Sequence, residues 1–173
     1  MVLPADLPRV SLTAAAFRVV RAGVDPLGTS GSLKAGGRWN PRHEFGAIYT
    51  SLDAATAAKE VARGLGQRGI DPSQFPSDAW WEYRLEVRLN SVLDLSNPEV
   101  LQRMGITPEL LIGPDVKVTR EIARAARERG YEAILVPSAA DPASKNLVIF
   151  PDKLAAGPEV LSSRPISLGA KAS

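Results

Sequence analysis

The sequence has no cysteine and only one histidine, His43, among its 173 residues. Without cysteine there is no disulfide framework, no zinc finger, no iron–sulfur cluster and no thiol nucleophile. With one histidine, no site can use two imidazole groups, and a Ser-His-Asp triad would depend on His43 alone. Any catalysis in this chain therefore relies on carboxylates, hydroxyls, guanidinium groups and aromatic rings.

A dominant charge is also missing. The 21 basic residues are nearly balanced by 19 acidic residues, which leaves a net charge of +2. Such a small positive surplus does not favour nucleic-acid binding, so we expect no direct nucleic-acid binding. RNA binding is therefore the weakest functional alternative. Arginine supplies 15 of the 21 basic residues, and its guanidinium group suits two-point contacts to phosphate or carboxylate.

Long hydrophobic runs are absent as well. No segment approaches the roughly 18 consecutive apolar residues that can span a bilayer. Residues 1–10 include Pro4, Asp6 and Pro8 and lack the apolar centre of a secretory signal. We therefore expect a cytoplasmic protein that does not bind membranes.

The remaining composition is that of a globular domain, with hydrophobic residues at 45% of the chain. Alternating or apolar runs predict strands over 17–20, 47–50, 83–89, 91–95, 133–136 and 147–150. Capped segments predict helices over 54–65, 98–104, 108–112 and 119–129, and residues 23–37 predict a loop. This mixture predicts an α+β fold, a single compact domain of mixed β-strands with short helices. We place that domain at 15–153, after an N-terminal arm at 1–14 and before a poorly ordered C-terminal tail at 154–173.

The richest candidate site is the run Gly36-Gly37-Arg38-Trp39-Asn40. Paired glycines let a backbone approach a ligand closely, the Arg38 guanidinium can bind a phosphate through two hydrogen bonds, and the Trp39 ring can stack on a flat ligand. A purely structural turn explains the glycines equally well.

Four further candidates are Tyr49, Glu60, Ser138 and Asn146, of which all but Glu60 adjoin the ends of predicted strands. Glu60 lies about 130° around its helix from the centre of the apolar stripe, so a catalytic role requires that flank to face a cleft. Each has a simpler alternative: an edge tyrosine, a solvated helix face, an ordinary turn serine and a turn-capping asparagine.

Taken in order, these residues resemble the RES domain family, which is named for its Arg, Glu and Ser. Arg18 and Arg38 are 20 residues apart, and Arg38, Tyr49 and Glu60 follow one another at intervals of 11. Each motif is weak alone, but the ordered set is specific and covers about 15–153. The matching positions are Phe17-Arg18, Gly36 to Asn40, Tyr49-Thr50-Ser51, Glu60, Pro137-Ser138 and Asn146.

The resemblance implies a fold akin to the ADP-ribosyltransferase, or diphtheria-toxin-like, NAD-binding core. It implies a bacterial enzyme that consumes NAD+ without a metal and acts as the toxin of a type II toxin–antitoxin pair. The implied partner is an Xre-like helix-turn-helix antitoxin, and assembly into an oligomer with it is left open. By similarity, the expected catalytic residues are Arg38, Tyr49, Glu60 and Ser138, and the expected NAD-binding residues are Arg18, Gly37, Trp39, Asn40 and Asn146.

The chemistry of the residues agrees with this resemblance. Breaking the nicotinamide–ribose bond produces an oxocarbenium-like cation and releases neutral nicotinamide, so a carboxylate such as Glu60 beside the ribose favours the reaction. Arg18 and Arg38 suit the diphosphate, and Tyr49 or Trp39 suits stacking on nicotinamide. Water (NAD glycohydrolase), phosphate (NAD phosphorylase) and a protein (ADP-ribosyltransferase) all stay open as acceptors. A non-catalytic module that binds a nucleotide or a partner is the remaining alternative.

Overall fold

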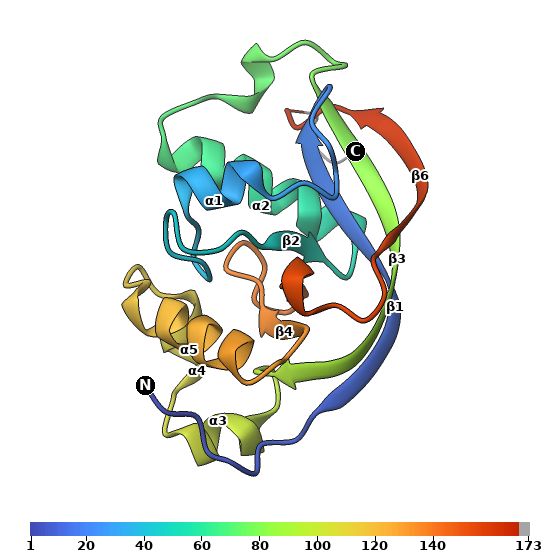
Figure 1. Ribbon diagram of the computed structural model, residues 1–173. Coiled ribbons are helices and arrows are strands. Elements are labelled where there is room, and N and C mark those ends of the chain that lie inside the picture. The colour runs from blue at the N-terminus through green and yellow to red at the C-terminus, as the bar shows by residue number, and fades with distance from the viewer. Residues whose placement is uncertain (170–173) are drawn as a thin grey trace.

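Two long strands form the spine of the molecule. In the computed structural model, which describes residues 1–169, β1 (Val10–Arg21) pairs antiparallel with β3 (Trp80–Asp94) along almost their whole length. Their register runs from Val10 opposite Val92 to Arg21 opposite Trp80. Both strands curve around one side of the domain (Figure 1).

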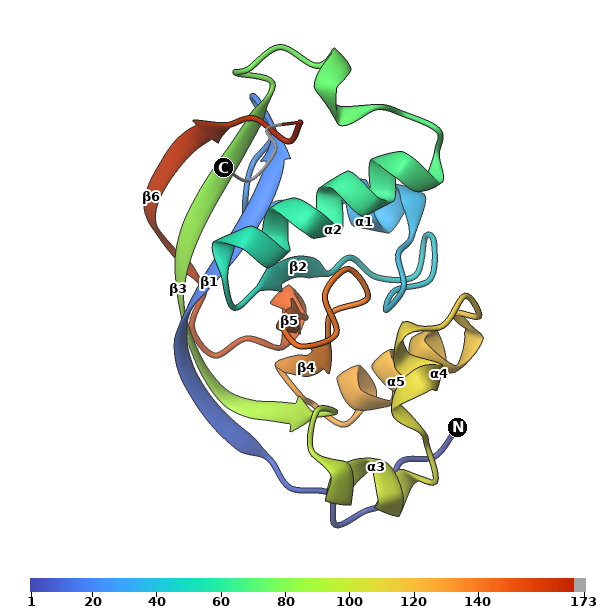
Figure 2. The same ribbon diagram turned by 180° about the vertical axis from the view of Figure 1, so that it is seen from behind.

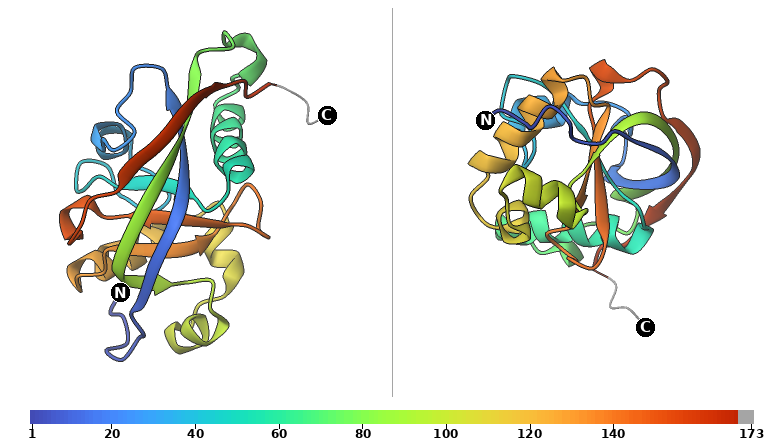
Figure 3. Two further views of the ribbon diagram at one scale, coloured as in Figure 1. Left: turned by 90° about the vertical axis from the view of Figure 1, so that its right-hand side faces the viewer. Right: turned by 90° about the horizontal axis from the view of Figure 1, so that it is seen from below.

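Three short strands connect β1 back to β3. β2 (Ile48–Ser51) pairs with β1 and with β5 (Lys145–Ile149), and β5 pairs with β4 (Ala133–Pro137), all antiparallel. β4 then pairs parallel with the end of β3, so the sheet is mixed and its hydrogen-bonded neighbours form a closed circuit. The last strand, β6 (Glu159–Ile166), pairs antiparallel with β3, and β1, β3 and β6 run side by side (Figure 3).

Helices cover the circuit at two places. α2 (Ala54–Gln67) lies against β1 and β2, whereas α3 (Pro98–Met104), α4 (Pro108–Ile112) and α5 (Lys117–Glu128) gather at the opposite end, beside β4 (Figure 2). A short helix, α1 (Ser30–Ala35), precedes the glycine pair. Single 3-10 turns occupy Pro72–Gln74 and Pro151–Lys153.

The start of α2 is fixed by its cap. Asp53 accepts hydrogen bonds from the Thr56 backbone N–H and hydroxyl, both at 2.8 Å, which satisfies donors that the first turn leaves free. Ala57 and Leu65 then pack with Val19 and Trp80 in an apolar cluster between α2 and the two long strands. This cap and this apolar face together set the rotation of the helix, and so the direction in which Glu60 points.

The expected α+β class with a mixed sheet and short helices is confirmed. Three local expectations were wrong. Residues 83–94 lie in one strand, because β1 pairs with most of this stretch and β4 pairs with its end. The predicted loop 23–37 contains α1. Within the tail expected to be poorly ordered, residues 159–166 form β6, whose backbone pairs with β3 although all its side chains except Ile166 are exposed, and residues 170–173 lie outside the described part.

Candidate active site

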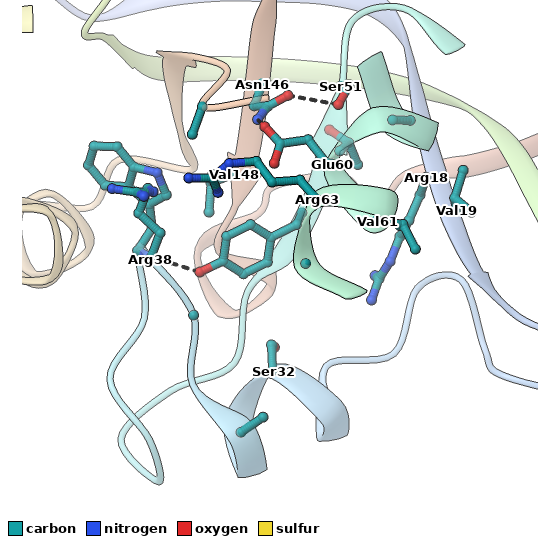
Figure 4. A pocket seen from close by; sticks show the side chains of 18 of the residues that line it. Arg18, Val19, Ser32, Arg38, Ser51, Glu60, Val61, Arg63, Asn146 and Val148 are labelled. Carbon is teal, nitrogen blue, oxygen red and sulfur yellow. Dashed lines mark hydrogen bonds between the residues drawn. The ribbon is translucent and has the colours of Figure 1, made fainter. Parts of the chain in front are cut away.

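A cavity of about 890 Å³ opens between α2, β1, β5 and the segment that carries the glycine pair. Seven of the nine predicted site residues line it: Arg18, Gly37, Arg38, Trp39, Tyr49, Glu60 and Asn146. The other two, Asn40 and Ser138, are 0% exposed and are hydrogen-bonded to residues that line it. The sequence set therefore converges on one place in the fold (Figure 4).

The Glu60 side chain is held in the cavity by hydrogen bonds. Its Oε1 atom accepts hydrogen bonds from the Ser138 hydroxyl and from Asn146 Nδ2, both at 2.6 Å, and a longer one of 3.5 Å from the Ala140 N–H. Within residues 1–169, Oε2 accepts no hydrogen bond. One carboxylate oxygen is thus anchored, and the other is available to a ligand.

The strand register explains how Asn146 reaches Glu60. Asn146 lies opposite Ser51 on β2, and the Ser51 hydroxyl donates to Asn146 Oδ1 at 2.7 Å. This bond directs the amide N–H₂ group of Asn146 toward α2, where it donates to Glu60 (Figure 4).

Ser138 holds the Glu60 carboxylate by a hydrogen bond from the turn after β4. It follows β4 directly, and its hydroxyl oxygen accepts hydrogen bonds from the Ala140 and Asp141 backbone N–H groups at 3.1 and 3.0 Å. With two donors directed at this oxygen, its own proton points to Glu60. Ser138 therefore contacts the carboxylate, not the open cavity.

A second cluster fixes the glycine pair. The Tyr49 hydroxyl donates to Asn40 Oδ1 at 2.7 Å and accepts from the Trp39 N–H at 3.0 Å, and Asn40 Nδ2 donates to the Ser32 and Phe45 carbonyls. Gly37 leaves just enough room for the Tyr49 ring, because an added Cβ would lie 2.8 Å from Tyr49 Cζ. This contact explains why the position needs glycine.

Burial raises the pKa of Tyr49 to about 12, which outweighs the opposing effect of the Trp39 and Asn40 backbone groups. The folded state therefore holds this proton more tightly than the unfolded chain, in which tyrosine titrates near 10. The stability that this proton contributes is complete below pH about 10 and is lost as pH rises through about 12.

This pKa yields a prediction for alkaline unfolding. In urea titrations at a series of pH values, we expect the stability advantage of wild type over Tyr49→Phe to shrink between pH about 10 and 12, with a slope approaching one proton. An advantage that stays constant over this range would show that Tyr49 ionises equally easily in the folded and unfolded states.

Two predicted arginines bind backbone carbonyls beside the cavity. Arg38 Nη1 donates to Leu111 O at 3.2 Å and to Gly113 O at 2.6 Å, and Arg18 donates to Pro26 O at 2.7 Å and to Gly28 O at 3.2 Å. Burial is the main cause that lowers the pKa of both side chains. In Figure 4 they lie on opposite sides of Glu60, so a long ligand could contact both.

Trp39 is 2% exposed and packs within the main apolar core. It forms part of the cavity wall, but little of its ring is free to stack on a ligand. Tyr49, which is half-buried and also lines the cavity, offers more aromatic surface.

Polar residues of the cavity that sequence reasoning did not assign to the site include Ser51, Arg63 and Arg120. Ser51 orients Asn146, and Arg120 Nε donates to the Gly37 carbonyl at 2.9 Å. The position of Arg63, three residues after Glu60, was a usable signal because residues at this spacing share a helix face. No such signal pointed to Arg120, since it lies 60 residues after Glu60 in the sequence.

Residues 1–169 contain neither a cluster of metal ligands nor a membrane-spanning helix. No group of three or more His, Cys, Asp and Glu side chains is placed to hold a metal ion. No helix in the described part is long and apolar enough to cross a membrane.

Curated relatives are found in mycobacteria. The chain is 28% identical over 123 residues to "NAD(+) phosphorylase MbcT" of Mycobacterium tuberculosis and Mycobacterium bovis, a match covering 71% of this chain and 66% of the relative. It is 32% identical over 114 residues to "Probable NAD(+) phosphorylase Rv3189" of M. tuberculosis, covering 66% of this chain and 53% of that protein. The matched region therefore spans between half and two thirds of these relatives' length.

A solved structure has the same fold. A chain from the crystal structure of the M. tuberculosis MbcT–MbcA toxin–antitoxin complex aligns with a TM-score of 0.82 at 24% identity, covering 92% of this chain and 87% of that chain. The sequence also matches the RES domain over residues 15–169, which is nearly its whole length and includes every site residue described above. The chain belongs to the RES domain family.

Proposed function

We propose that this protein is an enzyme that cleaves the nicotinamide–ribose bond of NAD+ and transfers the ADP-ribosyl group to inorganic phosphate. The observation that carries the proposal is Glu60, a carboxylate held through one oxygen by Ser138 and Asn146 with its other oxygen available, in a cavity lined by guanidinium groups. The activity for which the relatives are named, NAD+ phosphorylase, agrees with this chemistry.

The reaction balances without a redox step. The bond between the ribose C1 carbon and the nicotinamide nitrogen breaks, and its electron pair stays on the ring, which leaves as neutral nicotinamide. A phosphate oxygen then bonds to C1, giving ADP-ribose 1-phosphate, and the phosphate releases a proton. Positive charge develops on the ribose in between, and a fixed carboxylate lowers the energy of that state.

Each residue has a part in this proposal. Glu60 Oε2 faces the cationic ribose or its 2-hydroxyl group, while Ser138 and Asn146 position the carboxylate. Arg18 binds the NAD+ diphosphate, Arg38 contributes positive charge on the opposite side of Glu60, and Tyr49 provides an aromatic surface for nicotinamide. Gly37, Trp39 and Asn40 keep the loop in the shape that presents Arg38.

Three finer statements belong to the same proposal. The fold is akin to the ADP-ribosyltransferase NAD-binding core. The protein works in the cytoplasm, where NAD+ is available, as the toxin of a pair whose antitoxin is an Xre-like helix-turn-helix protein. The support for an antitoxin is that the structural neighbour was solved in a toxin–antitoxin complex.

The test is incubation of the purified chain with NAD+, with and without phosphate, and analysis of products by chromatography and phosphorus NMR. We expect nicotinamide release to rise with phosphate concentration and to match the amount of ADP-ribose 1-phosphate formed. Intact NAD+ under both conditions would overturn the proposal. Free ADP-ribose formed at a rate independent of phosphate would show that water, not phosphate, is the acceptor. Transfer of the ADP-ribosyl group from labelled NAD+ to a protein would show that a protein is the acceptor.

A further inference from the structure

The wall of the cavity carries more positive charge than its one carboxylate, Glu60, can offset. Within the described residues, none of its arginines forms an ion pair. NAD+ is itself only a weak anion, because its positive nicotinamide ring partly offsets its diphosphate. The arginines that line the cavity are Arg18, Arg38, Arg63, Arg68 and Arg120.

Arg63 stands out among these arginines by its place on α2. It lies one helical turn after Glu60, so both side chains project from the same face of the helix into the same part of the cavity (Figure 4). An acceptor must reach the ribose carbon that Glu60 faces. A cation fixed three residues from that carboxylate is therefore well placed to hold one.

The Arg63 and Arg38 side chains also reach the same part of the cavity (Figure 4). The charge of Arg63 is a cause of the lowered pKa of Arg38, second to burial. Both residues are half-buried, and like charges held together in a low-dielectric site repel unless an anion joins them. With its amide oxygen turned toward Arg63, Gln67 accepts from Nη1 and Nη2 at 3.3 Å, but this neutral group leaves the charge unbalanced.

We infer that Arg63, together with Arg38, forms the subsite for the acceptor, a phosphate dianion held beside Glu60. Guanidinium groups match phosphate through paired hydrogen bonds, and two of them neutralise a dianion. This subsite is separate from the Arg18 side of the cavity, which is left for the NAD+ diphosphate. The inference rests on the proposed phosphorolysis of NAD+ and names the residue that makes phosphate its acceptor.

The experiment compares wild type with Arg63→Gln and with the control Arg84→Gln. Arg84 is an exposed arginine of β3 outside this cavity, so the control removes the same charge from the chain. We expect Arg63→Gln to raise the KM for phosphate by about tenfold or more while the KM for NAD+ changes less than about twofold. Arg63→Lys should recover part of the loss, and Arg84→Gln should behave as wild type.

Two results would overturn the subsite: an unchanged KM for phosphate in Arg63→Gln, or an equal rise in both KM values, which would place Arg63 on the NAD+ diphosphate. A second readout does not need the reaction. Phosphate alone, titrated into the intact chain by calorimetry, should bind wild type and Arg84→Gln more tightly than Arg63→Gln. If wild type binds phosphate in this way but leaves NAD+ intact, the proposed function fails and the subsite stands.

Discussion

Replacing Glu60 with glutamine is expected to reduce kcat for NAD+ cleavage by about 100- to 1,000-fold, the loss typical of removing one group that stabilises transition-state charge. The amide has the same shape as the carboxylate, so its oxygen can keep the hydrogen bonds from Ser138 and Asn146. What disappears is the negative charge beside the ribose. We therefore expect the KM for NAD+ and the melting temperature to stay close to wild type.

The control for this prediction is Glu44→Gln. Glu44 is an exposed carboxylate paired with Arg124 at 2.8 Å, outside the cavity, and exposed pairs contribute little to stability. It should keep wild-type turnover. If Glu60→Gln keeps half or more of the wild-type kcat, the carboxylate does not stabilise the ribose cation, and the proposed chemistry is wrong.

Replacing Gly37 with alanine is expected to damage both stability and activity. The new Cβ would lie 2.8 Å from Tyr49 Cζ and 2.9 Å from Asn40 Oδ1, and closer still to the Tyr49 hydroxyl oxygen. Neither ring nor amide can retreat easily, because Tyr49 is hydrogen-bonded to Asn40 and to the Trp39 N–H. Forcing a methyl group into such a contact costs about 1–3 kcal/mol.

Activity should fall further than stability alone implies, because Arg38 is the next residue and moves with the loop. We expect a lower urea midpoint and at least about a tenfold drop in kcat/KM, since small misplacements of binding groups are costly. Gly66→Ala is the matched control: Gly66 lies on α2, and an added Cβ there meets nothing within 4 Å. Wild-type stability and activity in Gly37→Ala would show that the loop tolerates the added volume.

Local signals predicted the elements that carry the site. Asp53 and the apolar spacing after it predicted α2 and placed Glu60 on its flank. Neither could reveal that this flank faces a cavity, because the wall opposite comes from residues 78 and more positions away. Glu60, Ser138 and Asn146 were predicted to share one site only because their order along the chain resembles the RES domain family. No single segment predicted this.

Other features had no local signal. β6 was missed because its side chains are exposed and its sequence, with Pro165 near the end, lacks an alternating apolar face. Backbone pairing with β3 holds it in place instead. Ser138 was expected, by resemblance, among the catalytic residues, and the simpler alternative was an ordinary turn serine. The structure buries it completely beneath Glu60, because the turn after β4 closes through the Ser138 N–H to Ser144 O bond at 2.9 Å.

The hydrogen bonds at Glu60 also constrain how genes of this kind can recombine. Glu60 is bonded to Ser138, 78 residues later, and to Asn146, 86 residues later. A crossover between these codons would join a helix from one parent to a turn and strand from another. Even if all three residues are present in both parents, a shift of one ångström between the halves breaks bonds of 2.6 Å. Residues 60–146 should therefore be inherited as one block, and working chimeras should have their junctions outside it.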